Sequence, residues 1–528
     1  MRIKYLWIFV LIITIGITGC TPESEPDRES PPIVTVFAVN GEPEPVAGGT
    51  LNLSMRNPVV LNPILNTDPT VDRVLGLVFE HLFVMDGMRP VPNLVQHIEH
   101  GHNYVILLMS DHVWADGAPI TANDVGYTIN TIRNNPDSLY HHVIAPIASH
   151  TIINSRQIQI NFNTNMGGRA EYALLFPVIP MHFYQVGGRS LQTLAAGPFM
   201  INSMMLPREI ILAQNPMSFR PSNLNMVRVI ITPDIYTDFN ALNQGIIYAK
   251  VGNIQSLSLY GLASVNFNLN PLPTNRLEFV GFNFDNIALR DVRVRRALAY
   301  IFLGSQTIYT AYAGQINRTS SAAHPLARYY PLNLNYYETD LDLALLLFNE
   351  AGYEELDDGV LGSIAAGVPI PFSLRLVVNK ENTERMHMAN AFLQNAQALG
   401  LDINFMALSF DEYMEAIAGG NFDLALAGIN LPPFRELRPF LSSGGQGNFM
   451  NYASSELDSL LHTAAASLTD WSFAQNWLYV HHYINENLPI LPIGFRNDVL
   501  FTRLNLGGDI RPGLSNLYQS VDNWVILR

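Results

Sequence analysis

Residues 114–125 read WADGAPITANDV, a pattern typical of a tight turn followed by the start of a helix. Its Asp116-Gly117 pair suits a turn that needs a positive φ, because glycine has no Cβ to clash in that conformation. We expect Trp114, the large apolar residue just before the turn, to pack beneath it. The stretch therefore predicts a rigid corner that leads into a helix.

The helix is predicted over residues 121–132. Either Thr121 or Asn123 can cap it, because their side-chain oxygens accept hydrogen bonds from the free N–H groups of a first turn.

Further along, residues 384–428 follow the order helix, strand, helix, strand, and the apolar run 424–427 is interpreted as the last strand. This order of elements predicts an α/β fold.

The composition of the 528-residue chain excludes several classes of protein. At about 150 residues per domain, this length predicts three or four domains. With 30 basic and 45 acidic residues, the formal charge is −15, so we expect no nucleic-acid partner, which would need a concentrated basic surface. The single cysteine, Cys20, excludes an intrachain disulfide and any site built on paired cysteines.

The amino end accounts for this cysteine. Residues 1–4 carry positive charge and residues 5–17 are almost entirely apolar, but a helix of that length is shorter than the ~30 Å hydrocarbon core of a bilayer. We therefore interpret residues 1–19 as a signal peptide. The run ends in ITGC, residues 17–20, which resembles a bacterial lipobox and implies cleavage before Cys20 and its diacylation. The alternative is an ordinary secretory signal with an incidental cysteine.

A tether is predicted over residues 20–47, which are rich in Pro, Glu and Ser, a composition that cannot form a packed core. The folded part then begins near residue 48. Because two acyl chains anchor a protein stably, we expect it on the outer face of the cell membrane, at the cell surface or in the periplasm.

Signals of catalysis and of metal binding are weak. The chain has no GxSxG, HExxH or GxxxxGK[ST] motif, and its sole cysteine is the expected lipid anchor. The histidine pairs 141–142 and 481–482 could supply metal ligands, but neighbouring residues do not share a helix face. We predict no enzyme, no cofactor and no metal site.

Seven segments, in order, resemble the oligopeptide- and dipeptide-binding proteins of ABC importers, family 5 of the extracytoplasmic solute-binding proteins. The resemblance covers residues 48–528. The segments are GGTL with LNP (48–63), VFEHL (78–82), WADGAPITANDV (114–125), AGPF (196–199), FNF with DVRVRRAL (282–298), AGY (351–353) and NY with LDSLL (451–461).

The resemblance implies an α/β, two-lobed clamp of the periplasmic-binding-protein type, in its large three-domain type II form, with a hinge between the lobes. It also implies a monomer. The implied domain bounds are 48–75 with 190–275 and 490–528 for a discontinuous domain of lobe 1, 76–189 for a domain inserted into it, and 276–489 for lobe 2.

The family pattern places one edge of the cleft just before the LNP turn and the other just after the strand 424–427. Arg385, in NKENTERM, resembles an arginine that meets the ligand carboxylate, a role that suits the bidentate guanidinium fork. The alternatives are plain loops at both edges and a solvated Arg385. The residues expected to bind ligand are Asn57, Val59, Leu61, Arg385, Gly428, Ile429, Asn430 and Leu431.

The chain departs from the family in residues 428–441, GINLPPFRELRPFL. Peptide-binding members carry a tryptophan and aspartates here, and an aspartate holds the ammonium group of the peptide. In this chain Ile429 replaces the tryptophan, and Glu436, between Arg435 and Arg438, is the only acid. This argues against recognition of a free ammonium here and favours an amine-blocked or longer peptide, or a non-peptide anion.

We therefore expect a membrane-anchored receptor that captures an oligopeptide or dipeptide-like solute between two lobes and delivers it to an ABC permease. Alternative ligands are a nickel chelate, an opine or an oligosaccharide. The chain could also be a lipoprotein that senses peptides. A more distant alternative is an extracellular hydrolase on the same scaffold.

Overall fold

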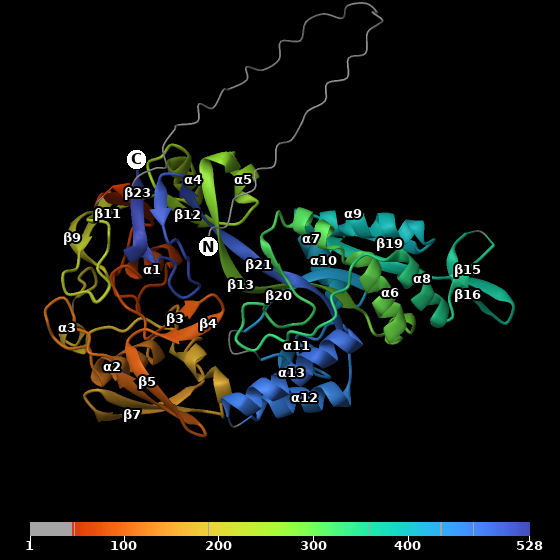
Figure 1. Cartoon of the computed structure of the whole chain (residues 1–528), viewed down its shortest axis with the longest axis horizontal. Helices are drawn as coiled ribbons and strands as arrows, with labels where there is room; N and C mark the ends of the chain where they lie inside the picture. The colour runs from red at the N-terminus through yellow and green to blue at the C-terminus, as the bar shows by residue number, and fades with distance from the viewer. Residues whose placement is uncertain (1–44, 47, 188, 358, 433–435, 468) are drawn as a thin grey trace, which may run out of the picture. The chain divides into compact units, whose positions relative to one another are not determined.

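A computed structural model describes residues 45–46, 48–187, 189–357, 359–432, 436–467 and 469–528. The part from residue 44 onward is one compact unit (Figure 1). The predicted signal peptide, Cys20 and almost all of the predicted tether lie outside the described residues. Among the described residues, no helix combines the length and the apolar character that crossing a membrane requires.

The corner predicted from residues 114–125 is confirmed. Gly117 has a φ of 85°, and Trp114 is completely buried. The helix that follows, α2, runs over Ala122–Arg133. Its first turn is held by the carboxylate of Asp124, which accepts hydrogen bonds from the Thr121 N–H at 2.8 Å and from its hydroxyl at 2.9 Å. Thr121, rather than Asn123, is therefore the cap.

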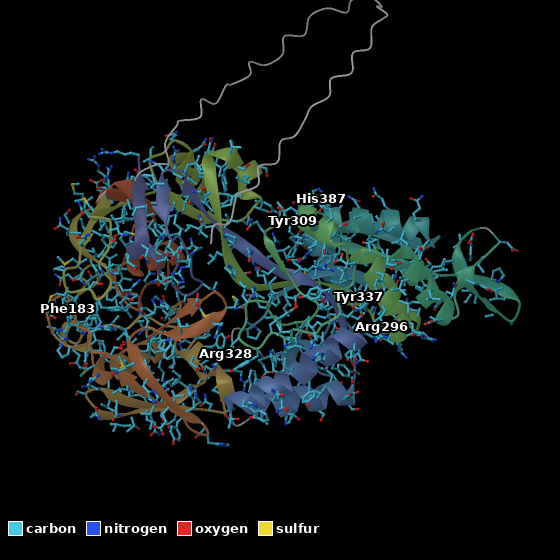
Figure 2. All side chains as sticks on the ribbon, viewed as in Figure 1. Phe183, Arg296, Tyr309, Arg328, Tyr337 and His387 are labelled. Atoms are coloured by element: carbon cyan, nitrogen blue, oxygen red, sulfur yellow. The ribbon has the colours of Figure 1, made fainter. Side chains whose placement is uncertain are left out.

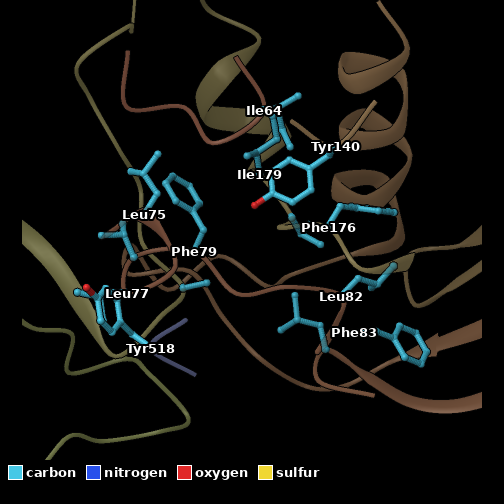
Figure 3. Packing of buried hydrophobic residues seen from close by; sticks show 14 of the residues in the cluster. Ile64, Leu75, Leu77, Phe79, Leu82, Phe83, Tyr140, Phe176, Ile179 and Tyr518 are labelled. Atoms are coloured by element: carbon cyan, nitrogen blue, oxygen red, sulfur yellow. The ribbon is translucent and has the colours of Figure 1, made fainter. Parts of the chain in front are cut away.

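A first hydrophobic core joins residues 51–251 to the end of the chain, where Leu500, Leu517 and Trp524 return to it. Figure 3 shows part of this core, with Tyr518 from the end of the chain. Two four-stranded sheets surround this core. One has the order β2-β11-β10-β9, with β2 parallel to β11, and the other is the antiparallel sheet β5-β6-β8-β7. Their bounds are Thr50–Met55, Met226–Ile231, Glu209–Gln214 and Phe199–Met205, then Val95–His100, Tyr104–Met109, Gln157–Phe162 and Ile147–Asn154.

A second core, spanning residues 277–495, packs on a seven-stranded sheet. The sheet has the order β12-β21-β13-β20-β18-β19, with β14 beside β21, and β18 is parallel to both β19 and β20. The strand bounds are Ala249–Gly252, Ile490–Arg503, Phe267–Phe282, Leu424–Asn430, Ser373–Asn379, Asp402–Leu408 and, for β14, Ile316–Arg318. The helices α6 (Val292–Phe302), α8 (Leu341–Glu350), α9 (Thr383–Ala398), α12 (Ser455–Ala465) and α13 (Asp470–Asn487) belong to this part. Parallel strands that alternate with helices confirm the predicted α/β class.

The antiparallel strands β13 and β21 connect the two cores. Leu272 and Leu500 belong to the first core, whereas Leu277 and Phe495 belong to the second. Between these points the ladder is irregular, because its register shifts between Pro273 and Leu277. Proline also cannot donate to a ladder. A weakened ladder at the junction is a suitable place for a hinge.

Smaller elements make up the rest of the secondary structure in the described residues. They are β1 (Pro45–Val46), α1 (Pro69–Leu75), β3 (Phe83–Asp86), β4 (Arg89–Pro92), η1 (Gly167–Leu174), α3 (Met181–Tyr184), α4 (Ile235–Asn243), α5 (Ser256–Leu259), η2 (Ser264–Asn266), η3 (Ala288–Arg290), α7 (Ser305–Ala311), β15 (Glu354–Glu355), β16 (Leu361–Ala365), β17 (Val368–Pro371), α10 (Phe410–Ala418), α11 (Arg438–Leu441), β22 (Leu506–Gly508), η4 (Val521–Asn523) and β23 (Trp524–Leu527).

Candidate functional site

A cavity of about 620 Å³ lies at the junction of the two cores. The gaps between the ribbons are occupied by side chains, as Figure 2 shows. The cavity is therefore described by the residues that line it. Its volume falls within the roughly 300–1,000 Å³ of small-molecule sites. One wall is formed by Asp72, Met85, Met88, Leu139, Tyr140, His142, Val143, Tyr172, Leu175, Leu514 and Ser515, and the other by Thr274, Asn275, Arg276, Asn430, Leu431, Pro432 and Asp498.

Two smaller spaces extend this cavity. A space of about 240 Å³ shares Asp72, Asp498 and the 514–515 segment with it. A narrow one of about 40 Å³ shares Met88 and Leu431. The two smaller spaces share lining residues with the large cavity but none with each other, an arrangement that suits an elongated ligand better than a round one.

The carboxylate of Asp72 enters the cavity from α1. This short helix begins there because Asp68 caps it, accepting from the Thr70 N–H at 2.7 Å, and because Pro69 stands in its first turn. The Tyr140 hydroxyl donates to Asp72, with Oη 2.9 and 3.0 Å from its two oxygens. Burial raises the pKa of Asp72 to about 6, although the Tyr140 hydrogen bond acts in the opposite direction.

His81 lies behind this pair, completely buried beside the Tyr140 ring. Its Nε2 is 3.5 Å from the Tyr140 hydroxyl, and the two rings meet edge to face at 6.0 Å. Burial, reinforced by the nearby charge of Arg220, lowers the pKa of His81 to about 3. The imidazole is therefore neutral at physiological pH.

The opposite wall carries a compensated pair of charges. Arg276 on β13 forms an ion pair with Asp498 on β21. Thr274, two residues before Arg276, donates its hydroxyl to the Arg496 carbonyl at 2.6 Å. This pair contributes no net charge to the cavity, whose remaining lining is largely apolar and aromatic.

The predicted edge before the LNP turn lies elsewhere. Asn57 is exposed and Val59 is 87% exposed, whereas Leu61 is buried and donates its N–H to the Ser190 carbonyl at 2.6 Å. None of these three residues belongs to the described lining of the cavity. Their contact with a ligand stays a prediction.

The predicted edge after residues 424–427 divides into two parts, and β20 itself extends as far as Asn430. Asn430 and Leu431 line the cavity. Gly428 and Ile429 sit opposite Glu278 and Leu277 in the β13 ladder. Of the two predicted edges, only Asn430 and Leu431 belong to the described lining of this cavity. Arg435 lies outside the described residues, and Glu436 forms an ion pair with Arg438.

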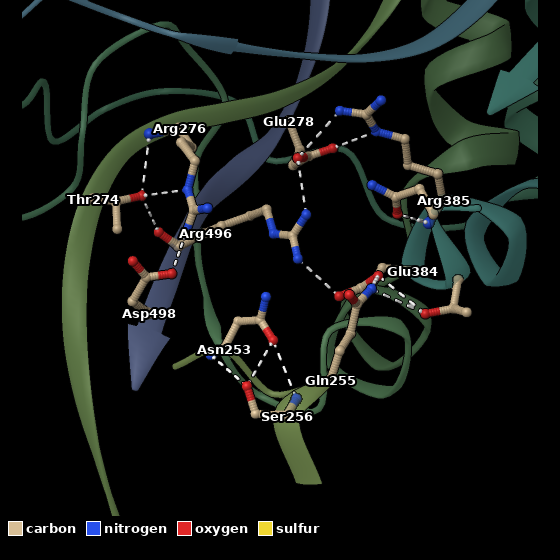
Figure 4. A network of polar contacts seen from close by, with 12 residues as sticks. Asn253, Gln255, Ser256, Thr274, Arg276, Glu278, Glu384, Arg385, Arg496 and Asp498 are labelled. Carbon is tan, nitrogen blue, oxygen red and sulfur yellow. Dashed lines mark hydrogen bonds and ion pairs between the residues drawn. The ribbon is translucent and has the colours of Figure 1, made fainter. Parts of the chain in front are cut away.

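Arg385 is part of a buried ionic network at the junction (Figure 4). Its Nε donates to Glu278 at 2.8 Å. Arg496 lies 3.6 Å from Glu278 and 2.8 Å from Glu384, so two arginines alternate with two glutamates. Gly428 allows the guanidinium to approach, since a Cβ there would lie 2.3 Å from Arg385 Nη2.

The network neutralises the charge of Arg385. Burial alone would lower its pKa, but the charge of Glu278 and their hydrogen bond raise the pKa of Arg385 above its usual value. A ligand carboxylate would have to compete with Glu278 for this guanidinium. The predicted role of Arg385 in ligand binding stays a prediction.

Sequence reasoning did not find Asp72, Tyr140, Arg276 or Asp498. Each looks ordinary in its own segment, and only the fold places them on one cavity.

The histidine pairs at 141–142 and 481–482 were noted in the sequence as possible metal ligands. His481 is buried and contacts the Ser321 hydroxyl at 2.5 Å. Within the described part of the chain, no three His, Cys, Asp or Glu side chains gather as a metal site.

Residues 89–449 match the family of bacterial extracellular solute-binding proteins, family 5. This region is more than half of the chain, and the chain therefore belongs to that family. The resemblance seen in the seven sequence segments is thus confirmed.

Similar proteins cover almost all of the chain. The probable deoxycholate-binding periplasmic protein YgiS of Escherichia coli is 22% identical over 497 residues, 86% of this chain and 89% of that protein. The structure of the ABC transporter substrate-binding protein CtaP of Listeria monocytogenes has a TM-score of 0.69 at 20% identity, covering 91% of this chain and 100% of the other. The periplasmic murein tripeptide-binding protein MppA, in its unliganded open form, gives 0.73 at 16% identity, covering 92% and 98%. The predicted two-lobed clamp is confirmed.

Proposed function

We propose that the chain is the receptor of an ABC importer and captures a peptide or peptide-like solute in the cavity between its cores. The observation that carries this proposal is the cavity itself, which has walls from both cores and lies where β13 and β21 cross between them. A ligand that touches both walls favours the closed arrangement, and hinge closure around a solute follows.

The exposed end of β20 supports a peptide. Strand β20 pairs with β13 over residues 424–430, but its described pairing with β18 is limited to Leu424 and Ala425. Beyond this pairing the Leu426 carbonyl accepts from the Tyr413 hydroxyl at 3.0 Å. The exposed end of the strand, from Gly428 to Asn430, then leads to the point where Asn430 lines the cavity. An extended peptide can add to such an edge through its main chain.

Similar proteins support the transport role and leave several ligand classes open. CtaP is named as an ABC transporter substrate-binding protein, MppA as a murein tripeptide-binding protein and YgiS as a probable deoxycholate-binding protein. We favour the peptide because the large cavity adjoins two smaller spaces and because one wall ends at the exposed end of β20. On this proposal, the chain binds and releases its solute without changing any bond.

The proposal includes the predicted anchor at Cys20 and the predicted domain bounds. Acylation is tested by labelling cells with a radioactive fatty acid. We expect label on the native chain and none on a Cys20→Ser variant, which should leave the membrane fraction. Equal label on both would contradict the anchor.

Native mass spectrometry of the chain purified without denaturant tests the ligand. We expect bound peptides, and we expect Val143→Trp, which fills the cavity, to lose them. Ile153→Trp is the matched control, because Ile153 is exposed on β7 and outside the cavity. A bound bile salt, metal chelate or heme would overturn the peptide proposal, as would peptides that Val143→Trp retains.

A further inference from the structure

We propose that Asp72 binds a positively charged ammonium group of the captured solute. This inference rests on the proposed function and deepens it, because it specifies the chemistry of one end of the ligand. It also assigns ammonium recognition to α1 in the first core, whereas the family's pattern places it in residues 428–441.

The contacts of Asp72 leave much of its carboxylate unused. Asp72 lines both the 620 Å³ cavity and the adjoining 240 Å³ space. The Tyr140 hydroxyl brings a single proton to it, whereas an ionised carboxylate offers about four acceptor sites. No Lys, Arg or His in the described part of the chain forms an ion pair with it.

Of the two acids that line the cavity, Asp72 is the one without an ion-pair partner among the described residues. Asp498 is paired with Arg276, and His81 is neutral because burial lowers its pKa. Arg73, its neighbour on α1, acts on Asp72 through its charge and lowers the pKa of Asp72, but it forms no ion pair with Asp72 among the described residues and borders only the smaller space. His142 lines the cavity in the segment between α2 and β7. A buried charge without a partner is costly, and that cost raises the pKa of Asp72. A ligand ammonium would offset it.

Tyr140 is a positioning residue for this carboxylate. Its hydroxyl lies within 3.0 Å of both Asp72 oxygens, and the His81 ring supports the Tyr140 ring from behind. The carboxylate is thereby held toward the cavity, across which Asn430 and Leu431 form the second wall. A solute with its ammonium at Asp72 and its body along that wall would contact both cores.

Two sources of ammonium are separated by three synthetic tripeptide libraries. The first consists of apolar tripeptides with a free amino terminus, the second of the same peptides N-acetylated, and the third of N-acetylated tripeptides that contain one lysine. Binding to the full chain is measured by isothermal titration calorimetry at pH 7. We expect the wild type to bind the first or the third library at least tenfold more tightly than the second.

Asp72→Asn should remove this preference and leave the binding of the second library unchanged. Asp137→Asn is the matched control, because Asp137 is exposed and outside the cavity lining; it should behave like the wild type. Tyr140→Phe should weaken the ammonium-bearing library severalfold, with less effect on the acetylated apolar one. Unfolding midpoints identify variants that fail to fold.

The pH dependence of the wild type gives a readout that needs no variant. The groups facing Asp72 are Tyr140, His81, Arg73, Asp498, Arg276 and His142. Ammonium binding should strengthen from pH 5 to pH 7 as Asp72 ionises, and Asp72→Asn should be flat. Equal binding of all three libraries, or a preference that survives in Asp72→Asn, would overturn the inference and leave the proposed function standing. Binding of no library by the wild type would instead overturn the peptide function itself.

Discussion

At the residue scale, the Arg385 side chain has two possible roles, which are to bind a ligand carboxylate and to stabilise the fold through a buried ion pair. Its Nε–Glu278 contact of 2.8 Å is buried, and Arg496 is the other cation near Glu278, at 3.6 Å. Removing one member of a buried pair leaves the other charge desolvated, which is more costly than the pair itself is favourable. Any loss of ligand binding in an Arg385 variant must therefore be read together with its stability.

We expect Arg385→Ala to lower the free energy of unfolding by about 3–5 kcal/mol, as breaking buried pairs does. Urea unfolding followed by circular dichroism measures it. Arg511→Ala is the control, because Arg511 pairs with Asp509 at an exposed site and should change stability little. If both variants unfold at the wild-type urea concentration, the network around Glu278 does not stabilise the junction.

His81 gives the fold an acid-sensitive group. Its pKa is about 3 in the folded chain against 6.5 unfolded. A lowered histidine pKa means that the unfolded state binds the proton first, so stability is lost as the pH falls below 6.5. Asp72 acts in the opposite direction, because its raised pKa adds stability as the pH falls through 6. The two groups therefore partly cancel in the wild type.

Replacing His81 isolates its contribution to the pH dependence of the unfolding free energy. Relative to His81→Gln, we expect the wild type to lose about 2 kcal/mol of unfolding free energy between pH 7 and pH 5. Urea unfolding at both values tests this, and the Asp72 contribution is common to the two proteins. His97→Gln, at an exposed position of β5, should keep the wild-type dependence. A constant difference between the wild type and His81→Gln would contradict the argument.

At the scale of one element, α2 depends on a carboxylate with several donors. Asp124 accepts from the Thr121 N–H and hydroxyl, and its other oxygen accepts from the Met181 N–H at 2.8 Å. Asp124 thus holds the start of α2, just after the corner at Trp114, and also connects the start of α3 to α2. Losing it should cost more than losing the cap alone.

We expect Thr121→Ala to cost about 1 kcal/mol of unfolding free energy, the usual value for a cap. Asp124→Ala should cost a further ~1–3 kcal/mol, because the Met181 N–H loses its acceptor. Thermal or urea unfolding ranks the two. Asn123→Ala is the matched control, since Asn123 is exposed at the next-but-one position. If Asn123→Ala and Thr121→Ala lower the unfolding free energy equally, Thr121 is not the cap of α2.

Local elements could be predicted from the sequence because their signals are local. The Asp-Gly corner, α2 and the strand at 424–427 each rest on residues within a dozen positions of one another. The site could not be predicted in this way, because Asp72 and Asp498 are far apart in sequence and neither has an unusual neighbourhood. For Arg385 the local motif suggested a ligand carboxylate as its partner. In the fold its partner is Glu278, which is more than 100 residues away and which no local sequence pattern connects with it.

At the scale of the whole molecule, the proposed function requires that the two cores separate and meet again around the cavity. Strands β13 and β21 hold them together at one end. Farther away, the Arg169 side chain from η1 donates to the Ala465 carbonyl at 3.2 Å and lies over the Phe473 ring, 5.2 Å from its centroid. Ala465 is the last residue of α12, whose carbonyl end attracts a cation. Arg169 thus links the two lobes at a second place besides β13 and β21.

Arg169→Met should shift the equilibrium toward the open arrangement, because it removes the charge and keeps much of the apolar stem. A contact of this kind is worth about 1–2 kcal/mol, so ligand dissociation should become roughly five- to thirtyfold faster. Stopped-flow release of the co-purified solute measures the rate, and small-angle scattering of the unliganded chain should give a larger radius of gyration. Arg133→Met is the control, because Arg133 also donates to carbonyls, those of Ile147 and Ala148, but within the first lobe. If Arg169→Met and Arg133→Met share the wild-type rate and radius, the contact at Ala465 does not govern closure, and the hinge strands alone must set the balance between open and closed forms.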